Sequence, residues 1–140
     1  MGKGKHDLLW AALVLAGFAL VFALAAVMYK RASSADHDAA EALAEVNAAL
    51  QAGDAAAAGH AADFIAARED YQRGLDRLTP LEDERPDLDL TLRLRIARTF
   101  QREGNFERAR EDGQRLRKRY PASSDVAAFA AELPAPAAGH

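Results

Sequence analysis

Residues 8–29 read LLWAALVLAGFALVFALAAVMY, an unbroken apolar stretch between Asp7 and the basic pair Lys30-Arg31. At about 1.5 Å of rise per residue, a helix of this stretch measures roughly 33 Å. The hydrocarbon core of a bilayer is about 30 Å thick. The stretch therefore predicts one transmembrane helix, which tethers the rest of the chain to a membrane.

A cleavable signal peptide is the alternative to a membrane-spanning helix. Its apolar region is about 7–15 residues long and is followed directly by small residues at the cleavage site. Here the apolar run is longer, and Lys30 and Arg31 separate it from the small-residue sequence SSA at 33–35. We therefore expect an uncleaved span, preceded by a short leader at residues 1–7.

Aromatic, basic and small side chains mark the expected span. Trp10 and Tyr29 lie near its two ends, where amphipathic rings favour the headgroup region, and Lys30 and Arg31 follow directly. Small residues recur along one helical face at spacings of three and four: Ala12, Ala16, Ala19, Ala23 and Ala26. Such a face lets a second helix approach closely, so we expect it to pack against a membrane protein partner. A chance scatter of alanines in an alanine-rich chain is the alternative.

The orientation of the span depends on a nearly balanced distribution of positive charge. Lys3 and Lys5 precede the span, and Lys30 and Arg31 follow it. The leader is short and needs no export, whereas a folded domain follows a stretch that resembles a signal anchor. We expect a single-pass protein of the inner (cell) membrane, with its N-terminus in the cytoplasm and its C-terminal domain in the periplasm or its equivalent.

Beyond the span, the composition predicts one small all-helical domain. The chain has 140 residues and no cysteine, which excludes disulfides and thiolate metal sites. Aromatic residues make up only 7% of it, which favours thin helices in close contact over a sheet-built core. We divide this part of the chain into a juxtamembrane linker at 30–35, a domain of four to five helices at 36–133 and a flexible Pro/Ala tail at 134–140.

Caps and apolar spacing place the first two helices of this domain. One helix follows the linker, with Ser34 or Asp36 as its expected N-cap and Gly53 as its expected C-cap. Asp54 is the expected N-cap of a second, longer helix, which ends before Thr79-Pro80 because the residue before a proline disfavours the helical conformation. An acidic connector, LEDERPD at 81–87, follows.

The stretch DLDLTLRLRIA at 87–97 is the one place where apolar residues alternate as in a strand. A lone strand has no ladder partner, and no other segment alternates in this way. Read at helical spacing, the same residues form an apolar stripe that ends at Gly104, with Asp87 or Asp89 as the N-cap. We therefore expect a helix.

Two further helices complete the expected domain. Asn105 is the N-cap of the first, which ends before Pro121, and residues 125–133 form the second. Four residues of the helix after Asn105 are expected to face inward: Phe106, Ala109, Gly113 and Leu116.

The segment 93–121 resembles a tetratricopeptide repeat, a helix-turn-helix unit of about 34 residues. The resemblance rests on a large-small pair, aromatic residues, a turn glycine, a small crossing residue, a core leucine and a terminal proline: Ile96, Ala97, Phe100, Gly104, Phe106, Ala109, Leu116 and Pro121. Sliding back 35 residues aligns Tyr71 with Phe106 and indicates a degenerate second-helix half. Gly113 departs from the family, which usually has a larger residue there. Because such repeats need several units for stability, the resemblance implies support from a partner or a self-associating surface.

Charge divides the domain into two parts of opposite sign. Residues 36–89 hold fourteen acidic and four basic side chains, a net charge of −10, whereas residues 93–119 hold ten basic and four acidic ones, a net charge of +6. One interpretation is that neighbouring helices match these charges internally. The other is that Arg115, Arg117, Lys118 and Arg119 form an outward docking patch for an acidic protein surface or anionic lipid headgroups.

No pattern in the sequence indicates catalysis, a metal site or a cofactor. The four histidines are far apart in sequence, and neither a glycine-rich phosphate loop nor a nucleophile motif is present. Nucleic acid is disfavoured because the chain is acidic overall, and no small-molecule substrate is indicated. We expect a membrane-anchored scaffold that binds a protein partner. The alternative is a small accessory subunit built permanently into a larger membrane complex.

Overall fold

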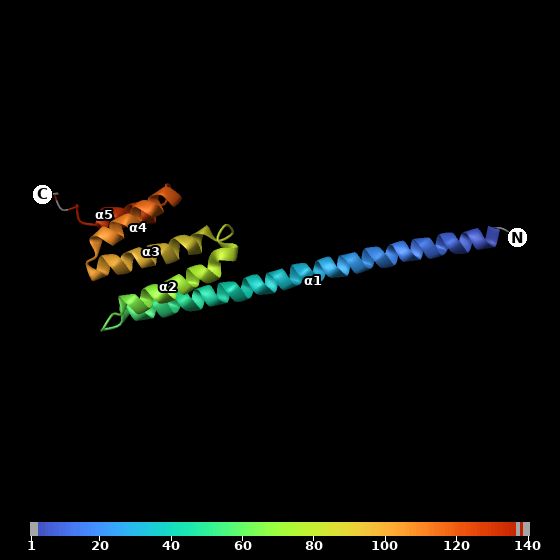
Figure 1. Ribbon diagram of the computed structural model, residues 1–140, viewed down its shortest axis with the longest axis horizontal. Helices are drawn as coiled ribbons and strands as arrows, with labels where there is room; N and C mark the ends of the chain where they lie inside the picture. Colours follow the sequence, from blue (N-terminus) through green and yellow to red (C-terminus); the bar gives the residue numbers. More distant parts are fainter. Residues whose placement is uncertain (1–2, 137, 139–140) are drawn as a thin grey trace. The chain divides into compact units, whose positions relative to one another are not determined.

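The computed structural model describes residues 3–136 and 138, and this part of the chain contains helices and no strand (Figure 1). The elements are α1 (Lys3–Ala58), α2 (Phe64–Leu78), the 3-10 turn η1 (Thr79–Leu81), α3 (Pro86–Glu103), α4 (Phe106–Arg119) and α5 (Ser124–Glu132). The chain forms two compact units, Met1–Ala40 and Glu41–His140, and α1 contributes residues to both. The all-helical prediction is confirmed.

In the first unit, the described part of α1 is almost entirely exposed. From Gly4 to Asp38 every residue is exposed, including the large apolar ones of the stretch 8–29. Continuous apolar surface of this extent is unfavourable in water. In length and composition α1 is suited to crossing a membrane, as the apolar stretch predicted.

The predicted linker at 30–35 is wrong, because these residues are helical within α1. The segment contains neither glycine nor proline, and serine costs a helix only tenths of a kcal/mol relative to alanine. A helix that is already nucleated on either side extends through such residues at little cost. Likewise, Asp36 starts no new helix.

Gly53 is not the C-cap that the sequence indicated, since α1 continues to Ala58. A Cβ atom at Gly53 would lie 2.5 Å from Cε1 of Tyr71, so the glycine provides room for the Tyr71 ring against α1. Asp54 is therefore not an N-cap. The second helix begins later, at Phe64, where the Asp63 carboxylate accepts a hydrogen bond from the amide of Ala66 at 3.0 Å.

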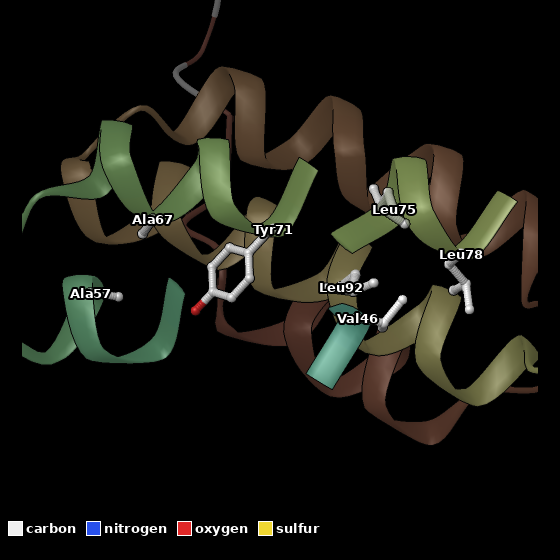
Figure 2. Close-up of a cluster of buried hydrophobic side chains, with 7 residues drawn as sticks. All are labelled: Val46, Ala57, Ala67, Tyr71, Leu75, Leu78 and Leu92. Atoms are coloured by element: carbon white, nitrogen blue, oxygen red, sulfur yellow. The ribbon is translucent and has the colours of Figure 1, made fainter. Parts of the chain in front are cut away.

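The core of the second unit has two clusters, and the first joins the end of α1 to α2 and α3. Its buried members are Val46, Ala57, Ala67, Tyr71, Leu75, Leu78 and Leu92. Figure 2 shows the Tyr71 ring extending from α2 toward α1, within this cluster. The Tyr71 hydroxyl donates a hydrogen bond to Oδ1 of Asp54 at 2.5 Å. Burial, followed by this carboxylate, raises the pKa of Tyr71 above its ordinary value.

The second cluster joins α3, α4 and α5. Its buried members are Ala97, Ala109, Leu116, Val126 and Phe129. As predicted, 87–97 is helical, α3 ends at Gly104 with φ +86°, and Asn105 caps α4 through its side-chain oxygen and the amide of Arg108 at 3.2 Å. Neither Asp87 nor Asp89 is the N-cap of α3, because Pro86 already occupies its first turn and Arg85 precedes it.

The tetratricopeptide-like core residues differ in burial. Ala97, Ala109 and Leu116 are buried together, while Phe100 packs partly buried against them. Ile96 packs against the first cluster, where Tyr71 is buried. Gly104 and Pro121 are exposed.

Two expectations for this core are wrong. Phe106 does not point inward, since it stands at the first turn of α4 with 37% of its surface exposed. The alignment of Tyr71 with Phe106 also fails, because Tyr71 lies in the middle of α2 and Phe64 takes the starting position equivalent to Phe106.

Gly113 leaves space for Phe129 of α5, because a Cβ atom at Gly113 would lie 3.3 Å from the Phe129 ring.

The tail prediction lies only partly in the described region. Residues 134–136 and Ala138 have no helix or strand assignment. Residues 137, 139 and 140, like Met1 and Gly2 of the leader, lie outside the described residues.

Candidate docking groove

A groove of about 500 Å³ opens between α2, α3 and α4 in the second unit. We call it the α2–α4 groove. Helix α4 supplies most of its lining, and α2 and α3 each supply two residues. The lining residues are Gln72, Leu75, Arg93, Ile96, Arg108, Asp112, Arg115, Leu116, Lys118 and Arg119. A volume of this size is within the range of about 300–1,000 Å³ typical of ligand sites.

The α4 wall of the groove follows from helical spacing. Arg108, Asp112, Arg115 and Arg119 are four, three and four residues apart, which places them along one face. Asn105 caps the start of this helix, and its buried residues Ala109, Gly113 and Leu116 show which face packs against its neighbours.

The floor of the groove is apolar. Each of the three helices contributes one apolar residue. Leu75 of α2 and Leu116 of α4 are 8% and 3% exposed, and Ile96 of α3 is partly buried. An apolar floor under a charged rim suits a ligand that carries both apolar and charged groups.

At one end of the groove, basic side chains hold a buried carboxylate. Asp89 is 1% exposed, and its oxygens lie 2.9 Å from Nε of Arg93 and 3.0 Å from Nε of Arg119. The Tyr120 hydroxyl donates a hydrogen bond to the same carboxylate. Burial, followed by this carboxylate, raises the pKa of Tyr120. Asp89 thus ties the start of α3 to the end of α4, because a buried charge is stable only when it is paired.

Asp112 is the one carboxylate in the lining, and two arginines share it. Its Oδ1 lies 3.6 Å from Nε of Arg108 and 3.3 Å from an Nη atom of Arg115. The side chain is only 14% exposed. Desolvation outweighs the two arginines, so the pKa of Asp112 is raised above its ordinary value.

Lys118 has no ion pair within the described part of the chain. Of the patch predicted from sequence, Arg115, Lys118 and Arg119 line the groove, whereas Arg117 is exposed outside it. Arg93 and Arg108 were missed as groove residues. The spacing of Arg108 from Arg115 and Arg119 was the available signal for one of them; Arg93 comes from a different helix.

Several other arginines match charges between helices, as the internal interpretation predicted. The shortest pairs join Arg68 to Glu103, Arg77 to Glu45 and Arg98 to Glu132, each at 2.8 Å. Arg68 also stacks over Phe100, with its guanidinium carbon 4.2 Å from the ring centre. These side chains stabilise contacts between neighbouring helices and lie outside the groove lining.

The residues predicted to act in the membrane all lie on exposed α1 positions. They are Ala12, Ala16, Ala19, Ala23 and Ala26 of the small-residue face and Trp10, Tyr29, Lys30 and Arg31 at the ends. Among the described residues, no group of histidine and carboxylate side chains is arranged to hold a metal ion.

The described part of the chain is all-helical, and its long N-terminal helix α1 contains one apolar stretch that is suited to crossing a membrane. Comparisons with protein families, with curated proteins and with solved structures found no match to this chain.

Proposed function

We propose that this protein is a membrane-anchored scaffold that binds a protein partner through its helical unit. The α2–α4 groove is the observation that carries the proposal, because it combines an apolar floor with five basic side chains at the rim. The exposed apolar part of α1 supports the anchor. Together they describe a binding surface held at a membrane.

The α3–α4 hairpin supports a tetratricopeptide-like character for this scaffold. Two antiparallel helices, Pro86–Glu103 and Phe106–Arg119, are joined by a turn at Gly104-Asn105 and cover close to the length of one such repeat. The preceding hairpin, from the end of α1 through α2, is the second unit of the proposed array.

The proposed topology places the N-terminus in the cytoplasm and the helical unit outside it. Because the chain lacks cysteine, single cysteines report on this directly. With a membrane-impermeant maleimide on intact cells, Ser124→Cys is labelled, whereas Gly4→Cys is labelled only after lysis. Both positions are exposed. The reverse pattern would overturn the topology.

Native purification tests the scaffold itself. Full-length protein extracted from its source membrane in mild detergent copurifies with a defined protein partner. Recovery of the chain alone, as a monomer or homo-oligomer, would refute the proposal.

An accessory subunit of a larger membrane complex is the second candidate. The observation that favours it is the unbroken exposure of α1 from Gly4 to Asp38, which leaves a large apolar surface for neighbouring transmembrane helices. Replacing Ala16, Ala19 and Ala23 by leucine separates the two candidates. A permanent subunit loses its complex, whereas a scaffold that binds through the groove keeps its partner.

A further inference from the structure

The rim of the α2–α4 groove carries more positive charge than the chain itself neutralises. Of its five basic side chains, Arg93 and Arg119 share the buried Asp89, and Arg108 and Arg115 share Asp112. Lys118 has no ion pair within the described residues. Two further carboxylates reach the rim at longer range: Glu82 lies 3.8 Å from Arg119, and Glu111 lies 3.7 Å from Arg108. Five cations thus face four carboxylates, which leaves a surplus of one positive charge. The rim therefore attracts further carboxylates from solution.

On one side of the groove, the existing ion pairs are weak enough for the carboxylates of a ligand to replace them. Both contacts of Asp112, at 3.6 and 3.3 Å, are longer than a strong charge-assisted hydrogen bond of about 2.7–2.9 Å. The Arg108 and Arg115 side chains are 46% and 67% exposed. By contrast, the pairs of Asp89 are short and their carboxylate is buried, so they belong to the fold. The available cations are thus Arg108, Arg115 and Lys118.

The floor adds a requirement that a simple anion does not meet. Leu75, Ile96 and Leu116 lie beneath these cations and favour an aliphatic side chain, because burying apolar surface there releases water. A ligand that satisfies both parts has carboxylates on its outer positions and an aliphatic side chain between them. Nucleic acid has phosphates and no such side chain, and the lining contains no aromatic residue on which a base could stack.

We propose that the α2–α4 groove binds an acidic peptide segment of the partner protein, with an aliphatic side chain on the Leu75, Ile96 and Leu116 floor and carboxylates at Arg108, Arg115 and Lys118. This inference rests on the proposed scaffold function and specifies the chemistry of its partner. Complementarity in charge sets the choice of segment, and the apolar floor sets its register.

The test is a binding titration with full-length protein in neutral detergent. The probe is a short fluorescein-labelled peptide of repeated Glu-Leu-Asp, followed by fluorescence polarisation. One control peptide replaces Glu and Asp with Gln and Asn, and another replaces Leu with Ser. We expect the acidic leucine peptide to bind, its affinity to fall as salt increases, and both control peptides to bind at least about tenfold more weakly.

Matched variants locate the binding to the groove. Arg115→Ala with Lys118→Ala removes two charges from the rim. Arg117→Ala with Arg73→Ala removes two exposed charges outside it, so the net charge is the same. The rim pair lowers the affinity about tenfold and the control pair leaves it unchanged. Circular dichroism of each variant checks that the helical fold is retained.

Three outcomes of the control experiments would overturn the proposal, and so would a failure of the acidic leucine peptide to bind. Equal weakening by both variant pairs would mean that overall charge, not the groove, binds the peptide. Full binding of the serine peptide would indicate that the groove binds any anionic surface, such as lipid headgroups, and not a peptide with aliphatic side chains. Sedimentation that shows self-association lost only in the rim pair would assign the groove to a second copy of this chain. If a native partner copurifies but the peptide does not bind, this inference fails and the scaffold function stands. If the peptide binds but no partner copurifies, the scaffold function fails.

Discussion

At the scale of single residues, close approach and burial decide roles that sequence patterns suggest only coarsely. Gly53 follows an apolar stripe and so resembles a helix terminus, yet it lies inside α1 under the ring of Tyr71. Gly113 has the same kind of role beneath Phe129. A pattern within one segment cannot reveal such roles, because the large residue that requires the space comes from a different helix.

Replacing Gly53 with alanine tests this role. The added Cβ would lie 2.5 Å from the Tyr71 ring, so we expect the second unit to lose about 1–3 kcal/mol of stability. Urea unfolding of the purified protein in neutral detergent, followed by circular dichroism, measures the change. Gly59→Ala is the control, since its nearest neighbour would be a backbone oxygen at 3.8 Å. Equal stability of the two variants would contradict the packing role of Gly53.

Asp112 makes the stability of the fold depend on pH, and the direction of this dependence follows from the shift of its pKa. Because burial raises its pKa in the folded state above the ordinary 3.8, the folded state binds this proton more tightly than the unfolded state. Its contribution to stability is therefore present below pH 3.8 and is lost as the pH rises through the folded-state pKa. Asp112→Asn imitates the protonated form. We expect the stability of this variant relative to the natural chain to be greater at pH 7 than at pH 3.

Glu132 provides a comparison of opposite sign. The Arg98 guanidinium, which bonds to it at 2.8 Å, lowers its pKa below the ordinary 4.5. Its stabilising contribution is therefore present above that pH and is lost as the pH falls. Glu132→Gln should be the less stable chain at pH 7, by a small amount because the pair is exposed, and should match the natural chain at low pH. The stability of both variants relative to the natural chain is measured by urea unfolding as a function of pH. If it changed with pH in the same way for Asp112→Asn and Glu132→Gln, the opposite roles of the two carboxylates would be contradicted.

At the scale of elements, local signals predicted the ends of α2 and α3 and the start of α4, but not the start of α3. Asn105 and Gly104 are examples, and the helical reading of 87–97 is correct because an alternating stretch without a partner strand favours a helix. The predicted breaks at 30–35 and at Gly53 failed. Weak helix formers there are flanked by strong ones, so the helix continues through them.

The N-cap of α4 is the element-level feature that sets the groove wall. Asn105→Ala removes the side-chain acceptor for the amide of Arg108, and we expect a loss of about 1 kcal/mol. The same substitution at Asn47, an exposed position inside α1, is the control. Urea unfolding of both variants measures the difference. A similar stability of the two variants would show that the cap contributes little.

At the scale of the whole molecule, the apolar part of α1 and the groove differ in how far sequence alone predicts them. The apolar stretch 8–29 is contiguous, so its length and composition are read directly. The groove draws on three helices, and only its α4 residues share a spacing that a linear reading detects. Arg93, Leu75 and Ile96 join it through the packing of α2 and α3, which no local pattern specifies.

The most direct test of a membrane-tethered groove that binds a protein is photo-crosslinking in the source membrane. Gln72→p-benzoylphenylalanine places the reactive group in the groove, and the neighbouring Arg73→p-benzoylphenylalanine places it on an exposed position of α2 outside the lining. We expect only the Gln72 variant to form a covalent adduct with one protein partner in the membrane fraction. An adduct of equal yield from Arg73, or no adduct from Gln72, would contradict it.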